Sequence, residues 1–191
     1  YPHGDIPVPF SENVFAYSVE GIWQGLKVFE NEDIDISKFN VQNMKGIKRT
    51  VRKLGKPLGH RKGTIGNELL DYLTARKLIY LPSYAWLLQN KTINELELLK
   101  EKAEINDLIF LDFETNGDIE NIRKPLSHAA LVKRFLEKKY PHLTLTRFTQ
   151  PETIKSKKVR KEKKEKKPQK EKKPRIKKNA VLVLPELPFP E

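Results

Sequence analysis

The sequence contains no cysteine among its 191 residues. Without thiols, the chain has no disulfide framework, no thiolate metal site and no cysteine nucleophile. It also has no apolar run close to the roughly 18 residues that a membrane-spanning helix needs, so we expect no membrane partner. The first ten residues lack the basic and apolar regions of a signal peptide, and we expect an intracellular protein.

Two common ligand-binding motifs are also absent. The sequence has no G-x-x-x-x-G-K-[ST] motif, which excludes a P-loop of the Walker A type. Its four histidines have no metal-ligand spacing such as H-E-x-x-H. We therefore expect neither a metal nor any other cofactor.

The positive charge is concentrated at one end of the chain. Hydrophobic residues make up 38% of the sequence, enough for a folded core, and the net charge is +12. Residues 155–178 contain 15 Lys or Arg and three Glu, so this segment alone carries a charge of +12. The distribution predicts a neutral domain over residues 1–150 that is followed by a basic tail.

Hydrophobic periodicity predicts a mainly α fold, a single compact α+β domain with a few short strands. The expected helices cover residues 18–29, 37–54 and 66–77, a short segment from Pro82, a segment after the capping box of Thr92 and Glu95, and residues 127–140. Strands are expected at residues 108–111, where the run is apolar and suits a buried strand, and at residues 143–148.

Residues 151–179 form a low-complexity Lys/Glu/Pro tail that we expect to be disordered. Its cations resemble a nuclear-localisation or nucleic-acid-binding run and favour salt-sensitive contact with phosphate backbones, in the cytoplasm or the nucleus. The contact residues that we expect are Lys157, Lys158, Arg160, Lys161, Lys163 and Lys164. A solubilising tail without a fixed partner is the alternative.

Residues 180–191 are apolar, although they follow the charged tail. An apolar segment after such a spacer is typical either of docking back on the domain or of binding a protein partner's groove. We expect one of these two arrangements for residues 180–190.

The first candidate site lies on the helix predicted at residues 18–29. Glu20, Gln24 and Lys27 have i, i+4 and i+7 spacing and share one stripe, and Trp23 borders that stripe. A carboxylate, an amide and an ammonium beside an indole ring suit a ribosylated ligand that bears phosphate. The alternative is an ordinary solvent-facing stripe.

The second candidate site is a basic stretch over residues 45–62, which contains no acidic residue. Arg49, Arg52, Lys53 and Arg61 are its candidate phosphate ligands, because guanidinium groups and a Gly-containing loop suit phosphate recognition. A solvated basic helix face is the alternative.

The third candidate is Asp112, a carboxylate directly after the predicted strand at residues 108–111. Residues 116–118 (Asn-Gly-Asp) are typical of a turn. Ser127 is expected to cap the next helix, and His128 to lie in its first turn.

Residues 18–29, Ser-Val-Glu-Gly-Ile-Trp-Gln-Gly-Leu-Lys-Val-Phe, resemble the opening motif of the NADAR family, approximately S-V-E-H-x-x-Q-A-x-K-F. The chain has Gly21 where that motif commonly has His. The resemblance is closest over residues 18–29, extends loosely to about residue 80, and lacks the family's later Asp followed by Trp-Gly.

The resemblance implies a mainly helical domain that acts on N-glycosidic bonds of an N-ribosyl or ADP-ribosyl nucleotide, without a metal. In this interpretation Glu20 is the catalytic carboxylate and Asp112 a second one. The implied ligand-binding residues are Trp23, Gln24, Lys27, Arg49, Arg52, Lys53 and Arg61.

Three hypotheses follow for the function. The first is an N-glycosidase-like domain whose tail holds it near nucleic acid. The second is a non-enzymatic, nucleic-acid-associated or ribonucleoprotein structural protein whose tail binds phosphate backbones. The third is a sensor that binds the same nucleotide without cleaving it.

Overall fold

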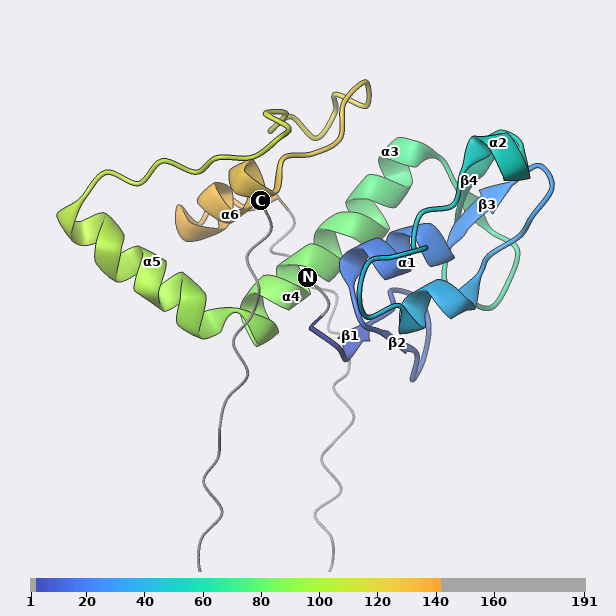
Figure 1. Ribbon diagram of the computed structural model, residues 1–191, viewed down its shortest axis with the longest axis horizontal. Helices are drawn as coiled ribbons and strands as arrows, with labels where there is room; N and C mark the ends of the chain where they lie inside the picture. Colours follow the sequence, from blue (N-terminus) through green and yellow to red (C-terminus); the bar gives the residue numbers. More distant parts are fainter. Residues whose placement is uncertain (1–2, 142–191) are drawn as a thin grey trace, which may run out of the picture. The chain divides into compact units, whose positions relative to one another are not determined.

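The computed structural model describes residues 3–141, and Figure 1 shows their arrangement. The elements, in chain order, are strands β1 (Ile6–Pro7) and β2 (Phe15–Ala16), helix α1 (Val19–Gly25), strand β3 (Lys27–Phe29), the 3-10 helix η1 (Ile36–Asn40), helix α2 (Val51–Leu54), strands β4 (Pro57–Arg61) and β5 (Leu69–Leu70), helix α3 (Tyr72–Ala75), the π-helical segment η2 (Arg76–Tyr80), and helices α4 (Leu81–Lys91), α5 (Ile93–Ile105) and α6 (His128–Leu136).

Helices account for 42% of the described residues and strands for 11%, so the fold is mixed α+β. The strands form two small antiparallel sheets, β1-β2 and β3-β4-β5. In the second sheet His60 of β4 lies between Lys27 of β3 and Leu70 of β5. The sheet therefore places His60 directly beside the end of α1.

Helix α1 begins where the sequence predicts it, at Ser18, whose hydroxyl accepts a hydrogen bond from the Gly21 N–H. Two glycines one turn apart let η1 approach the helix closely. A Cβ at Gly21 would lie 2.7 Å from the Lys38 carbonyl oxygen, and one at Gly25 would lie 2.3 Å from the Phe39 ring. Any larger residue at either position would push α1 and η1 apart.

Helices α3 and α4 join through η2 into one continuous helix, the long green helix of Figure 1. Pro82 lies inside it, where a proline removes a donor and clashes with the carbonyl four residues earlier. The π-helical segment relieves this conflict because its turn is wider, and the Leu81 N–H bonds to the Arg76 carbonyl, five residues back.

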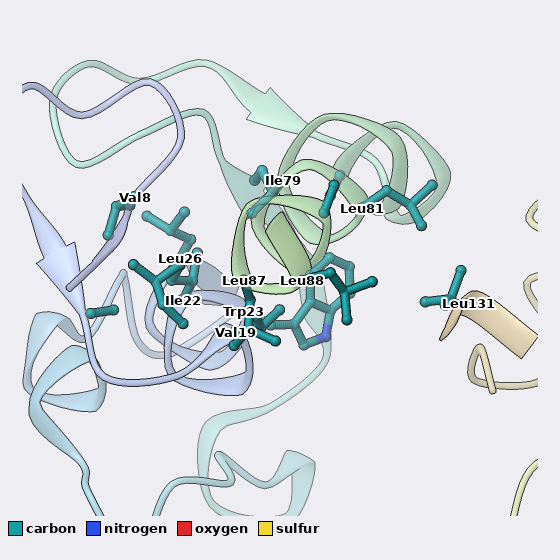
Figure 2. Packing of buried hydrophobic residues seen from close by; sticks show 14 of the residues in the cluster. Val8, Val19, Ile22, Trp23, Leu26, Ile79, Leu81, Leu87, Leu88 and Leu131 are labelled. Atoms are coloured by element: carbon teal, nitrogen blue, oxygen red, sulfur yellow. The ribbon is translucent and has the colours of Figure 1, made fainter. Parts of the chain in front are cut away.

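The core lies between α1 and the long helix. Figure 2 shows Trp23 close to Leu87 and Leu88, and Ile22 and Leu26 belong to the same cluster of buried side chains. Val19, Ile22, Trp23, Leu26 and Phe29 are all buried. The helix predicted over residues 18–29 nevertheless ends at Gly25, so Phe29 contributes to the core from β3. Tyr140 closes the other end of the core, and its hydroxyl donates to the Leu81 carbonyl at 2.9 Å.

Several predicted elements are confirmed. Helix α5 follows Thr92, and α6 follows Ser127, whose side chain accepts a hydrogen bond from the Ala130 N–H. The expected capping box of Thr92 and Glu95 is wrong, because the Thr92 hydroxyl donates to the Leu88 carbonyl at 3.2 Å and caps no N–H of α5. Within residues 3–141, no helix is long and apolar enough to cross a membrane.

Other predicted elements are wrong. Residues 37–54 contain η1 and α2 with irregular chain between them, because Met44 and Gly46 adopt positive φ values that interrupt a helix. The expected helix at residues 66–77 begins only at Tyr72, after β5. Residues 108–111 form no strand and are not buried: Ile109 is 84% exposed and Leu111 90%. The predictions for residues 142–191, the basic tail and the apolar end included, lie outside the described residues.

Candidate functional site

A cleft of about 810 Å³ runs between α1, the long helix, the start of α5 and the start of α6. This volume suits a ligand of nucleotide size. The lining side chains that carry polar groups or aromatic rings are His3, Ser18, Glu20, Trp23, Gln24, Lys48, Tyr72, Arg76, Tyr80, Tyr84, Thr92, Glu95 and His128.

Glu20 reaches this cleft from α1 and is held there by Gln24. The Gln24 Nε2 atom donates to Glu20 Oε1 at 2.9 Å, and Gln24 Oε1 accepts the Arg49 N–H at 3.2 Å. Gln24 is 6% exposed, so its amide has little freedom to turn. The buried amide of Gln24 thus orients the Glu20 carboxylate. The i, i+4 spacing of these two residues predicted that they share one stripe.

Arg49 stabilises the same corner from within the protein. Its guanidinium donates to the carbonyl oxygens of Gln24 at 3.4 Å, of Asp33 at 2.5 Å and of Lys27. Because these bonds join α1, β3 and the chain before η1, Arg49 is a structural residue. It does not line the cleft, and its expected role as a phosphate ligand does not fit this geometry.

Trp23 forms an aromatic wall beside Glu20. Its ring centroid lies 5.5 Å from that of Tyr72 and 5.7 Å from that of Tyr80, both in edge-on geometry. On another side Trp23 lies against His60, with ring centroids 3.7 Å apart. Burial and the nearby Lys27 charge lower the pKa of His60 to about 3, so this imidazole is neutral near pH 7.

The long helix contributes a stripe of side chains at intervals of four residues: Tyr72, Arg76, Tyr80, Tyr84 and Leu88. In a regular α-helix, steps of four overshoot the 3.6-residue turn, so such a row drifts around the helix. The wider π-helical turn at residues 76–80 reduces this drift. Pro82 obscured the stripe in the sequence, because it suggested two separate helices.

Tyr80, Tyr84 and His128 form a cluster on the side of the cleft that faces α6. The Tyr80 hydroxyl lies 2.8 Å from His128 Nε2. The Tyr84 ring is parallel to that of Tyr80, with centroids 6.2 Å apart, and lies 5.4 Å from the His128 ring. Burial, followed by the charges of Tyr84 and Glu20, raises the pKa of Tyr80 far above its usual value, so its hydroxyl is protonated near pH 7 in the resting protein.

Arg76 anchors the chain that precedes α6. Its guanidinium donates to the carbonyl oxygens of Ile119, Asn121 and Lys124 at 2.8, 2.9 and 3.0 Å, and the residue is 2% exposed. These bonds hold the loop that leads to His128. Neither Arg76 nor the three tyrosines were candidates from the sequence.

Lys27 is not among the residues that line the cleft. Helix α1 ends at Gly25, so the i+7 residue already belongs to β3 and leaves the helical stripe. The Lys27 ammonium lies 5.9 Å from the Trp23 ring centroid. Burial lowers its pKa, with opposing effects from the charges of Glu20 and Arg49.

The other basic candidates also lie outside the lining of the cleft. Arg61 donates to both Asp33 carboxylate oxygens at 2.5 and 2.7 Å and to the Gly66 carbonyl oxygen, so both of its terminal nitrogens already have partners. Arg52 and Lys53 are exposed on α2. Lys48, from the same basic stretch, lines the cleft instead, and its side chain is exposed to solvent.

Asp112 acts at the start of α6 and does not line the cleft. Its Oδ2 atom accepts the Ser127 hydroxyl at 2.9 Å and the Ala129 N–H at 3.2 Å. Slight burial raises its pKa, but these hydrogen bonds outweigh that effect and hold the pKa below its usual value. The geometry makes Asp112 a capping group for α6.

The cleft thus combines one held carboxylate, a wall of aromatic rings, a tyrosine–histidine pair and a lysine at its edge. Within residues 3–141, no three His, Asp or Glu side chains gather as metal ligands would.

A family model described as a family of unknown function (DUF6939) matches residues 1–132. This range includes every residue that lines the cleft. The comparisons with curated proteins and with solved structures give no match.

Proposed function

The chain belongs to the family of unknown function DUF6939, and from the geometry of its cleft we propose that it hydrolyses the N-glycosidic bond of an N-ribosyl or ADP-ribosyl nucleotide. The observation that carries this proposal is the Glu20 carboxylate. It reaches into an aromatic cleft and is oriented by the buried amide of Gln24.

Cleavage of an N-glycosidic bond develops positive charge on the sugar, in a transition state that resembles an oxocarbenium ion. A carboxylate fixed beside the sugar stabilises this charge and accepts a proton from the attacking water. Glu20 suits both roles, because the Gln24 bond leaves one of its carboxylate oxygens free of that contact.

The remaining lining residues suit the other parts of such a ligand. Trp23, Tyr72 and Tyr84 offer flat apolar surfaces for a base, and Lys48 offers an ammonium for a phosphate. The resemblance of residues 18–29 to the NADAR opening motif supports the same assignment. At Gly21, where that motif has His, the 2.7 Å approach of the Lys38 carbonyl excludes a side chain.

For the tail, we propose contact with nucleic acid or another polyanion, which the charge of +12 over residues 155–178 supports. Such contact would bring the domain close to a modified base in the cytoplasm or the nucleus. For residues 180–190, docking on a protein partner remains a separate proposal.

The test is the release of free base by the full-length chain, measured by mass spectrometry. The substrates are ADP-ribose conjugates, DNA that carries ADP-ribosylated guanine, and ribosylaminopyrimidine phosphates. We expect release from at least one of these classes, and we expect Glu20→Gln to lower it by about 10²–10⁴-fold.

Glu97→Gln is the matched control, because Glu97 is an exposed carboxylate on α5 that does not line the cleft. It should release base at the wild-type rate. Full activity in Glu20→Gln, or no release by the wild-type chain, would contradict the proposal. Nucleotide binding without cleavage would identify a sensor instead.

A further inference from the structure

Tyr80 and His128 both line the cleft, and both carry exchangeable protons. Neither takes part in the function proposed above. The Tyr80 hydroxyl and the His128 Nε2 atom lie 2.8 Å apart. Both residues line the cleft that holds Glu20, and the Glu20 charge is among those that raise the pKa of Tyr80. The Tyr80–His128 pair and the Glu20 carboxylate can therefore contact the same bound ligand.

The two members of the pair differ in their access to solvent. His128 is exposed at the first turn of α6, whereas the Tyr80 side chain is largely enclosed by Trp23 and Tyr84. The imidazole can therefore exchange protons with water, while the hydroxyl faces the interior of the cleft. This arrangement suits the transfer of a proton from solvent to a buried acceptor.

The orientation of the imidazole is fixed by its neighbours. The Tyr84 ring lies against it at 5.4 Å, and Asp112 and Ser127 hold the helix start from which it projects. Arg76 fastens the preceding loop.

We infer that the Tyr80 hydroxyl donates the proton that the leaving base takes up, and that His128 positions this hydroxyl and resupplies its proton. The inference rests on the proposed function. As the bond between the sugar carbon and the base nitrogen breaks, its electron pair stays on the nitrogen, which takes the Tyr80 proton. The water oxygen bonds to the sugar carbon as Glu20 takes one of the water protons. In the same step the Tyr80 oxygen takes the His128 Nε2 proton, so no tyrosinate accumulates. The exposed imidazole then takes up a proton from solvent at Nδ1, and Glu20 returns its proton to solvent.

The test compares two leaving groups on the full-length chain. One is a base that leaves only with an added proton, as in the substrate panel above. The other is nicotinamide, attached to the same ribosyl phosphate as a pyridinium glycoside. Nicotinamide departs from this glycoside as a neutral molecule and needs no added proton. We expect Tyr80→Phe and His128→Ala to slow release of the first base by about 10²-fold or more. Nicotinamide release should change by less than about threefold.

Added imidazole supplies a second readout that a purely structural role would not move. It should restore base release in His128→Ala and leave the wild-type rate unchanged. Tyr17→Phe, at an exposed tyrosine that does not line the cleft, is the matched control and should act as wild type. Circular dichroism should show the same fold in all variants.

Equal losses on the two leaving groups, no loss on either, or a His128→Ala defect that imidazole does not restore would each overturn the inference. The proposed function fails differently, since it is contradicted when Glu20→Gln retains full activity on both leaving groups. The two failures are therefore distinguishable within one experiment.

Discussion

The α1 side of the cleft and the α6 side differ in how their functional groups are held. On the α1 side, Gln24 holds Glu20, and the Arg49 backbone holds Gln24. Both residues lie on α1, which packs closely on η1. The α6 side follows a long chain segment without helix or strand, in which Ile109, Leu111 and Phe113 are 84%, 90% and 97% exposed.

The α6 side is held by a few polar anchors in addition to the buried Leu126 and Leu131. Arg76 binds three carbonyl oxygens of the loop, and Asp112 binds the start of α6. The difference suggests that the carboxylate is preorganised, while the wall that meets the leaving base is positioned by single residues. Four substitutions test this comparison, and they follow from the largest expected effect to the smallest.

Arg76→Ala should have the largest effect, because it leaves three loop carbonyl oxygens without their charged donor. We expect the free energy of unfolding to fall by about 3 kcal/mol or more. Urea denaturation measures the loss, and hydrogen exchange should rise in residues 116–127 before the α1 side is affected. Arg123→Ala, at an exposed arginine of the same loop, is the control. A loss below about 1 kcal/mol in Arg76→Ala would show that the loop does not depend on this anchor.

His60→Phe tests the α1 side through pH. The folded protein holds His60 neutral, with its pKa lowered to about 3, whereas the unfolded chain takes up a proton below about pH 6.5. Stability should therefore fall with decreasing pH between these values, by about 1.4 kcal/mol per pH unit from this residue.

The phenylalanine keeps the ring against Trp23 but cannot titrate. The slope of unfolding free energy between pH 4 and 6 should become shallower by that amount. Identical slopes in wild type and variant would mean that His60 takes up a proton in the folded state.

Gln24→Leu removes the bond that orients Glu20 and keeps a side chain of similar size. We expect a loss of about 1–2 kcal/mol in unfolding free energy, because the Arg49 N–H loses its buried acceptor. Base release should fall about tenfold or more, since the carboxylate is no longer held. Steady-state kinetics beside thermal unfolding separates the two effects. Unchanged kinetics would argue against preorganisation of this wall.

Asp112→Asn should have the smallest effect, at most about 1 kcal/mol, because the amide oxygen still accepts a hydrogen bond at the start of α6. The lowered pKa of Asp112 means that its charge stabilises the fold above the unfolded value of about 3.9. That contribution is lost as pH falls through the folded pKa. The unfolding free energies of wild type and variant should therefore draw closer as the pH falls below the unfolded value, and a difference that does not shrink with decreasing pH would contradict this account.

The sequence predicted the α1 side of the site better than the α6 side. Spacing within one short helix brought Glu20, Trp23 and Gln24 together, because a helix fixes such neighbours locally. The same rule failed for Lys27, since the helix ends at Gly25 before the stripe is complete. Local periodicity is reliable only within the bounds of its element.

Charge patterning did not indicate which basic residues line the cleft. Arg49 and Arg61 lie in the basic stretch as expected, but backbone carbonyls and Asp33 already accept hydrogen bonds from their terminal nitrogens. These partners are distant in sequence, so composition alone does not distinguish a structural arginine from one that awaits phosphate. Lys48, from the same stretch, reaches the cleft instead.

The long helix was missed for a different physical reason. Pro82 normally ends or kinks a helix, and the expected break separated Tyr72 from Tyr80 and Tyr84. The π-helical turn removes that break and aligns the four-residue stripe. A row of aromatic and basic residues at i, i+4 and i+8 across a proline was the signal that would have found this wall.

Hydrolysis in ¹⁸O-labelled water tests the central claim most directly. The cleft should place the labelled oxygen on the sugar carbon that loses the base, with release from Glu20→Gln lowered by about 10²-fold or more. Mass spectrometry of the sugar product locates the label. Label found on a phosphate instead, or release from Glu20→Gln at the wild-type rate, would contradict the assignment of this cleft as an N-glycosidase site.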